Sequence, residues 1–71
     1  MKNIRSKQQA YANRIKKLRR DKNWSQRDLA KEFGVSPGAV AHWETGEREL
    51  SGPIRKLLDI YEKSLLNREG L

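Results

Sequence analysis

Two short segments in the middle of the chain each carry a helix-start signal at one end and a helix-stop signal at the other. The signals are Ser25 and Gly34 for the first segment, then Ser36 and Gly46 for the second. A serine side chain can accept a hydrogen bond from a free N–H of the first helical turn, and glycine readily adopts the left-handed conformation that ends many helices. The sequence therefore predicts helices over 26–33 and 37–45, joined by a tight turn around Gly34.

Two neighbouring residues strengthen this prediction. Asp28 lies three residues after Ser25, which is the spacing of a capping box. Pro37 would occupy the first position of the second helix, where its missing N–H has no partner to lose. Neither segment shows the alternation of apolar and polar residues that is typical of a strand.

A longer helix is predicted before this pair. Tyr11, Ile15 and Leu18 recur at helical intervals, and Ser6 with Gln9 has the spacing of a second capping box. We expect this helix to run from about Lys7 to Lys22. Residues 1–6 form either an extra helical turn or a loose basic arm.

A fourth helix is predicted after the polar loop 47–49, opened by Ser51-Gly52-Pro53. Its apolar residues form a stripe at the spacing of one helix face: Ile54, Leu57, Leu58, Tyr61 and Leu65. A chain of 71 residues can bury a single core. We therefore expect a compact all-α domain of four to five helices over residues 7–66, followed by a tail at 67–71.

The positive charge is concentrated near the amino end. The chain carries a net charge of +7, and its first 20 residues include eight basic and no acidic side chains. Such asymmetry suits a surface or arm that binds a polyanion, because each basic group near a phosphate releases a counterion. The alternative is a solvated basic end with no partner.

Several classes of protein are not expected. With no cysteine and one histidine, the chain lacks the residues for a thiolate or multi-histidine metal cluster. Its carboxylates are scattered, and no nucleophile has a base at a plausible spacing, so we expect neither an enzyme, nor a metal, nor a cofactor. The apolar stretches are too short for a membrane span or a signal peptide, which predicts a soluble, cytoplasmic protein.

Residues 26–45 resemble the helix-turn-helix of the phage-repressor and Cro-like proteins, the Xre-like family. The similarity lies in Ala30 at the predicted helix crossing, Gly34 in the turn and the apolar positions around them. The pattern Trp43-Glu44-x-Gly46-x-Arg48 is also similar to the family's, and the resemblance covers about residues 14–65. It implies a lambda-repressor-like fold in a bacterial or phage-encoded protein, associated with the nucleoid when bound.

The resemblance also implies a docking geometry, in which the third helix enters the major groove and the second lies across the DNA backbone. The residues placed at the bases or in the groove are then Gln26, Ser36, Pro37, Gly38, Ala41 and His42. Small side chains dominate this set, so few bidentate base contacts are available. Specificity would then depend on His42, on Gln26, on DNA shape or on the basic arm. His42 is either a base or phosphate contact or an idle surface residue.

Other residues are expected to bind phosphate or to hold the fold. The phosphate contacts implied are Arg27 and Arg48, with Lys2, Arg5 and Lys7 of the arm. Glu47 and Glu49 would repel a phosphate near Arg48 unless they point away. In the family, an arginine of the first helix pairs with a glutamate of the third, which predicts a structural pair of Arg19 and Glu44. Gly34 and Trp43 are expected to be structural as well.

The resemblance implies a sequence-specific double-stranded DNA-binding regulator of transcription, most simply a repressor that acts as a homodimer. The alternative is an antitoxin or phage-related adaptor whose main role is to bind a protein partner such as a toxin or effector. Ile60 and Leu66 lie off the predicted core face, where they are either a dimer contact or isolated exposed apolar residues. RNA binding stays open, although the deep groove of duplex RNA would not admit the third helix.

Overall fold

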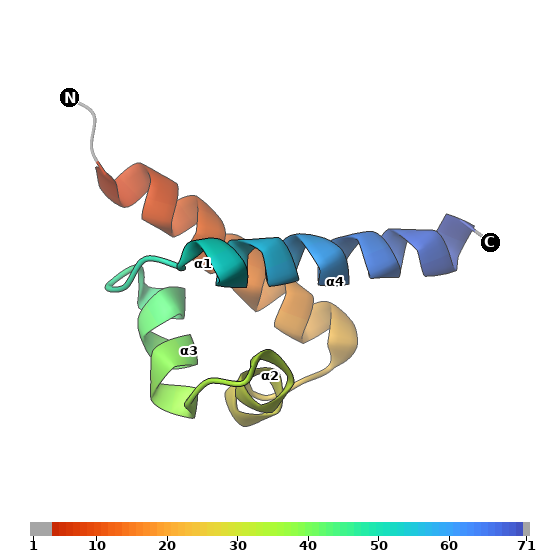
Figure 1. The fold of residues 1–71 in the computed structure, drawn as a ribbon, viewed down its shortest axis with the longest axis horizontal. Coiled ribbons are helices and arrows are strands. Elements are labelled where there is room, and N and C mark those ends of the chain that lie inside the picture. The colour runs from red at the N-terminus through yellow and green to blue at the C-terminus, as the bar shows by residue number, and fades with distance from the viewer. Residues whose placement is uncertain (1–3, 71) are drawn as a thin grey trace.

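The computed structural model describes the backbone of residues 4–70 and the side chains of residues 9–65. Four helices follow one another: α1 (Ile4–Lys22), α2 (Gln26–Phe33), α3 (Pro37–Thr45) and α4 (Gly52–Gly70) (Figure 1). No strand occurs between residues 4 and 70. The predicted all-α class is confirmed, and the predicted bounds of the two central helices agree with the structure.

The first helix begins earlier than predicted. It includes Ile4, so residues 4–6 form an extra helical turn, and Ser6 lies inside the helix. The prediction that Ser6 caps the helix is therefore wrong. Serine is tolerated within helices, and Ile4 continues the apolar stripe that begins further along α1, so the helix extends past the predicted cap. At its other end, α1 stops at Asn23, whose φ of 63° is left-handed.

The start of α2 has the predicted capping box. The Ser25 side chain accepts a hydrogen bond from the Asp28 N–H at 3.0 Å, and the Asp28 carboxylate accepts one from the Ser25 N–H at 2.9 Å. The helix ends at Gly34, which has a φ of 70°. The following residue, Val35, donates its N–H back to the Ala30 carbonyl at 2.9 Å. The chain thus leaves α2 through a turn that a residue with a Cβ would strain.

The next helix repeats this arrangement. The Ser36 side chain accepts from the Ala39 N–H at 3.2 Å, and Pro37 fills the first turn. Gly46 ends α3 with a φ of 83°, and the next N–H, of Glu47, donates to the His42 carbonyl at 3.0 Å. The helix is only nine residues long because both its ends are fixed.

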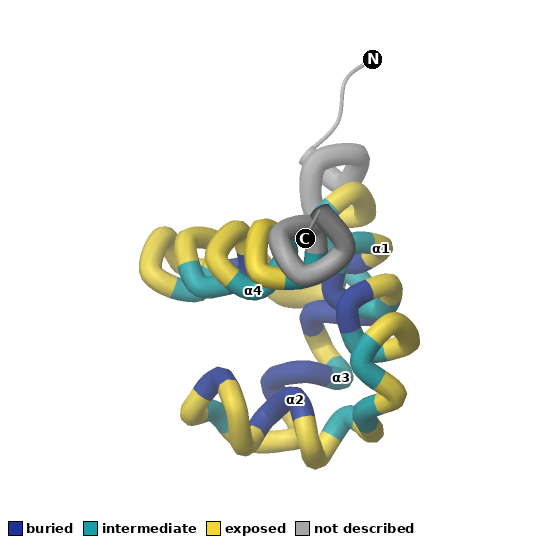
Figure 2. Tube along the Cα trace, turned by 90° about the vertical axis from the view of Figure 1, so that its right-hand side faces the viewer, coloured by how far each residue is buried: buried dark blue, intermediate teal, exposed yellow. Residues whose placement is uncertain are grey.

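The core lies where α1, α2 and α3 face one another, with α4 crossing α1 (Figures 1 and 2). Each helix and the loop before α4 contribute to it. Its buried members are Ile15, Leu18, Leu29, Ala30, Phe33, Ala39, Val40, Trp43, Leu50 and Leu58. Ala30 and Trp43 are both buried in this core, and so is Leu50, whose burial no local signal predicted.

Only part of the predicted stripe on α4 is fully buried. Leu58 is inaccessible to solvent, and the other four apolar residues are partly buried against the core. Tyr61 stacks on Phe33 with ring centroids 5.3 Å apart and meets the Trp24 ring edge-on at 5.8 Å. The helix continues to Gly70, so residues 67–70, expected as a tail, belong to it. Among the described residues, no helix is long and apolar enough to span a bilayer.

Candidate nucleic-acid interface

Apart from Gln26 at the start of α2, the residues predicted to read DNA lie at the N-cap and on the solvent-facing side of α3. Ser36, Pro37, Gly38 and His42 are exposed, and Ala41 is partly buried. Gly38 and His42 are four residues apart, so they share one helix face. The opposite side of the helix is turned into the core by its buried residues, Ala39, Val40, Trp43 and Glu44. We call residues 36–42, without the buried Ala39 and Val40, the reading edge.

Glu44 and Arg19 form the predicted structural pair. The guanidinium donates from Nε to Glu44 Oε2 at 2.7 Å and from Nη2 to Glu44 Oε1 at 3.2 Å. A third donor, Arg19 Nη1, reaches the carbonyl oxygen of Trp24 at 3.2 Å. The Glu44 side chain is only 7% exposed and the Arg19 side chain 27%, so the carboxylate is shielded from water and the pair, which links α1 to α3, is partly buried.

Gln26 is the predicted site residue that the structure brings into this network. Its Nε2 donates to Glu44 Oε1 at 3.0 Å, which connects the start of α2 to α3. An ionised carboxylate can only accept hydrogen bonds, so the amide nitrogen must face Glu44 and the amide oxygen must face away. Gln26 therefore keeps one N–H and its oxygen for a ligand.

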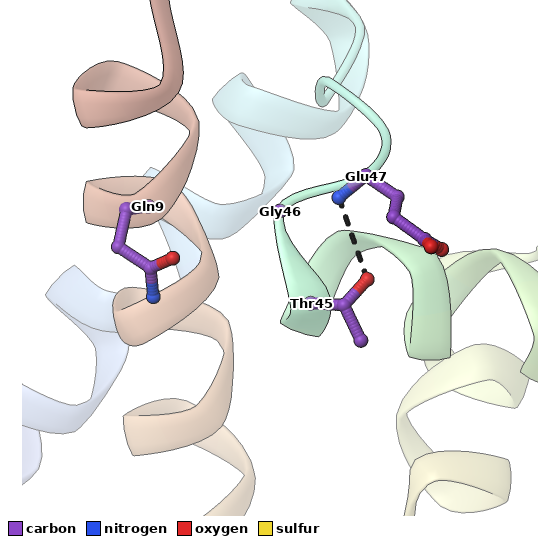
Figure 3. Close-up of a pocket in the computed structure, with 4 residues that line it drawn as sticks. All are labelled: Gln9, Thr45, Gly46 and Glu47. Atoms are coloured by element: carbon purple, nitrogen blue, oxygen red, sulfur yellow. Dashed lines mark hydrogen bonds between the residues drawn. The ribbon is translucent and has the colours of Figure 1, made fainter.

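His42 pairs with the acid that follows α3. Its Nδ1 lies 2.7 Å from Glu47 Oε1, and both side chains are more than half exposed. The hydrogen bond with His42 holds the pKa of Glu47 below its usual value. In Figure 3 the Glu47 side chain extends away from Gln9 of α1. This carboxylate is thus engaged with the reading edge, an arrangement that the sequence did not predict.

Two exposed arginines flank the reading edge along the chain. Arg27 lies in the first turn of α2, and Arg48 in the loop after α3. Free backbone donors are also present, because the Ser25 cap takes up the N–H of Asp28 and leaves those of Gln26 and Arg27. A helix amino terminus with free N–H groups favours an anion. The two predicted phosphate ligands in the described region are therefore accessible.

Part of the positive charge predicted for the amino end is paired with acids within the fold. Arg14 donates to Asp59 at 2.7 Å and to Glu62 at 2.6 Å, which joins α1 to α4. The hydrogen bond to Glu62 raises the pKa of Arg14 further above its ordinary value. Arg14 and Arg19 are thus both committed to internal pairs. The side chains of Lys2, Arg5 and Lys7 lie outside the described residues.

A shallow hollow of about 230 Å³ lies between α1 and the end of α3. It is lined by Gln9, Thr45, Gly46 and Glu47 (Figure 3). The Glu47 N–H donates to Thr45 Oγ1 at 3.4 Å, which holds the loop that forms one wall. Among the described residues, no cluster of histidine and acidic side chains could hold a metal ion.

The fold thus has two capped helices joined at Gly34 and an accessible edge on the second. A model of the protein family described as Helix-turn-helix matches residues 15–65. The chain belongs to this family. No curated protein and no solved structure gave a significant match.

Membership of the helix-turn-helix family confirms the predicted resemblance to phage-repressor and Cro-like proteins. The matched residues begin within α1 and end in the last third of α4, so they include the buried core cluster from Ile15 to Leu58 and the reading edge. The family match indicates a DNA-binding regulator of transcription, and in such folds the second helix of the pair is the recognition helix.

Proposed function

We propose that this protein is a sequence-specific repressor that binds double-stranded DNA with α3 in the major groove and blocks transcription by occupying its site. The observation that carries the proposal is the accessibility of the reading edge, where Pro37, Gly38 and His42 are exposed while the other side of α3 is packed into the core. Small residues at the start of α3 let its backbone approach the floor of the groove.

The proposal assigns phosphate contacts to the exposed Arg27 and Arg48 and to the free N–H groups at the start of α2. Gln26 completes the interface, with one N–H and one oxygen free beside its bond to Glu44. Lys2, Arg5 and Lys7 are proposed to add contacts from the amino end. A homodimer would place two such edges on half-sites about one helical turn apart.

Selection of bound sequences from a random duplex pool tests this function. We expect one preferred sequence to emerge. Equal, steeply salt-dependent affinity for every duplex would contradict the proposal, because it would mean that phosphate contacts alone are made.

A pair of charge variants tests whether DNA binds at the reading edge. Pro37→Glu puts a carboxylate in the first turn of α3, where the helix dipole tolerates it, and should abolish binding. Ser64→Glu adds the same charge to an exposed position of α4 and should leave binding unchanged. Equal effects of the two variants would place the interface elsewhere.

A second candidate is an antitoxin or adaptor, which would need an exposed apolar contact for a protein partner. Ile60 of α4 is the residue that could supply it: it is 57% exposed and is the one large apolar side chain so exposed among the described residues, although a single exposed apolar residue is common on protein surfaces. Size-exclusion chromatography with and without the protein encoded by the neighbouring gene tests this candidate. A complex that forms with the native chain and is lost in Ile60→Lys would support it, whereas an unshifted peak would contradict it.

A further inference from the structure

The geometry around His42 defines which of its ring nitrogens carries a proton. Nδ1 lies 2.7 Å from Glu47 Oε1, a hydrogen-bonding distance. A carboxylate offers no proton, so Nδ1 must be the donor. In a neutral imidazole the second nitrogen, Nε2, then has a lone pair and no hydrogen.

The backbone holds this arrangement in place. Gly46 turns the chain back at the end of α3 with a φ of 83°. The His42 carbonyl then accepts from the Glu47 N–H at 3.0 Å and from Thr45 Oγ1 at 3.0 Å. Glu47 is therefore fixed beside His42 by the same loop that ends the recognition helix.

We propose that Glu47 is a positioning residue that fixes the tautomer of His42, so that neutral His42 presents Nε2 to DNA as a hydrogen-bond acceptor. The inference rests on the proposed function, because the proposed docking brings His42 to a duplex. The His42 side chain is 56% exposed, which leaves the ring accessible while Nδ1 is engaged.

This polarity restricts what His42 can bind. Phosphate oxygens only accept hydrogen bonds, so they offer nothing to a bare Nε2. In the major groove the base donors are the N6 amino group of adenine and the N4 amino group of cytosine. Guanine and thymine present acceptors there, which would repel the lone pair. His42 thus selects adenine or cytosine on the strand that it meets.

The tautomer is measured directly in the free protein by long-range ¹H–¹⁵N correlation spectra of the imidazole. The spectra are recorded where titration of the same resonances shows the ring to be neutral. We expect the Nδ1–H form in the native chain and in Glu49→Ala, and loss of that preference in Glu47→Ala. Glu49→Ala is the matched control, since it removes the same charge from the same loop, and the structure pairs His42 with Glu47 and not with Glu49. An Nε2–H form in the native chain would overturn the proposal.

The predicted base preference is measured by selection of bound sequences from a random duplex pool at the same pH. One position on one strand should favour adenine or cytosine over guanine or thymine by about three- to tenfold, as expected for a single hydrogen bond. This preference should vanish in His42→Ala and weaken in Glu47→Ala. A native preference that His42→Ala leaves unchanged would overturn this inference alone. The absence of any preferred sequence would instead overturn the proposed function.

Discussion

Arg19 of α1 and Glu44 of α3 meet side by side, with two hydrogen bonds of 2.7 and 3.2 Å between guanidinium and carboxylate. The same carboxylate accepts a bond from Gln26 at the start of α2. One buried acid therefore joins three helices. It also fixes the direction of a side chain proposed to contact DNA, so stability and recognition share this residue.

Replacing Glu44 should destabilise the fold. Glu44→Gln keeps the shape of the side chain but leaves the Arg19 guanidinium without a counter-charge, and we expect it to lower the free energy of unfolding by about 2 kcal/mol. Urea denaturation measures the change. Glu49→Gln alters an exposed acid and should change stability by less than about 0.5 kcal/mol. Equal stabilities of the two variants would contradict the structural role of Glu44.

The capping box of α2 should make stability depend on pH in acid. The bond from the Ser25 backbone N–H, and then that to the Ser25 side chain, lowers the pKa of Asp28 below its ordinary 3.8. A lowered native pKa means that the stabilisation is complete above pH 3.8 and is lost as the pH falls through the native value.

Asp28→Asn tests this contribution, because asparagine can still accept the backbone bond but carries no charge. The variant should be less stable than the native chain at about pH 7, and the gap should close in strong acid, where the native Asp28 is protonated. Urea denaturation at both pH values gives the comparison. A gap of the same size at both would show that charge is not involved.

Gly38 offers a substitution in which stability and binding should move in opposite directions. An added Cβ would meet nothing closer than Ser36 Oγ at 3.8 Å. Gly38→Ala should therefore stabilise α3 by up to about 1 kcal/mol, since glycine is the poorer helix former. Its methyl group would hold the backbone away from the groove, so affinity for the selected duplex should fall.

Thermal unfolding and duplex titration measure the two effects. Gly52→Ala in α4 is the matched control. Its Cβ would meet nothing within 4 Å, and it lies outside the reading edge, so it should leave affinity unchanged. Undiminished affinity in Gly38→Ala would mean that the start of α3 does not approach the DNA.

The salt dependence of DNA binding should differ between variants of two arginines that carry the same charge. Arg27→Gln removes a proposed phosphate contact and should reduce the slope of log affinity against log salt by up to about one. Arg14→Gln removes a charge already paired with Asp59 and Glu62, so its slope should match that of the native chain. The reverse result would assign the DNA-facing surface to α1 and α4.

Local signals explain which parts of the fold were predictable. The bounds of α2 and α3 are fixed by Ser25, Gly34, Ser36 and Gly46, whose effects act within one helical turn, and each could be read from the sequence. The pair of Arg19 and Glu44 could be predicted only from the family resemblance, because no local signal links residues 25 positions apart.

Contacts that depend on the packed structure had no such signal. Arg14 bonds to Glu62, 48 residues away, so its charge was counted toward DNA binding when the fold already neutralises it. Leu50 is buried although it follows a polar loop, because the chain must pass the core on its way to α4. The bond between His42 and Glu47 depends on the turn at Gly46, which brings the two side chains together. From the sequence, Glu47 is expected only to repel a phosphate near Arg48 unless it points away.

Because α3 is short, its helical shape depends on the rest of the fold. A helix of nine residues is too short to persist in water by itself, because too few hydrogen bonds offset the cost of nucleation. The reading edge thus keeps its helical shape only while Val40 and Trp43 are anchored among the other helices. Under the proposed function, occupancy of the DNA site follows the folded fraction of the chain, so a destabilising core substitution far from the DNA lowers occupancy as a lower protein concentration would.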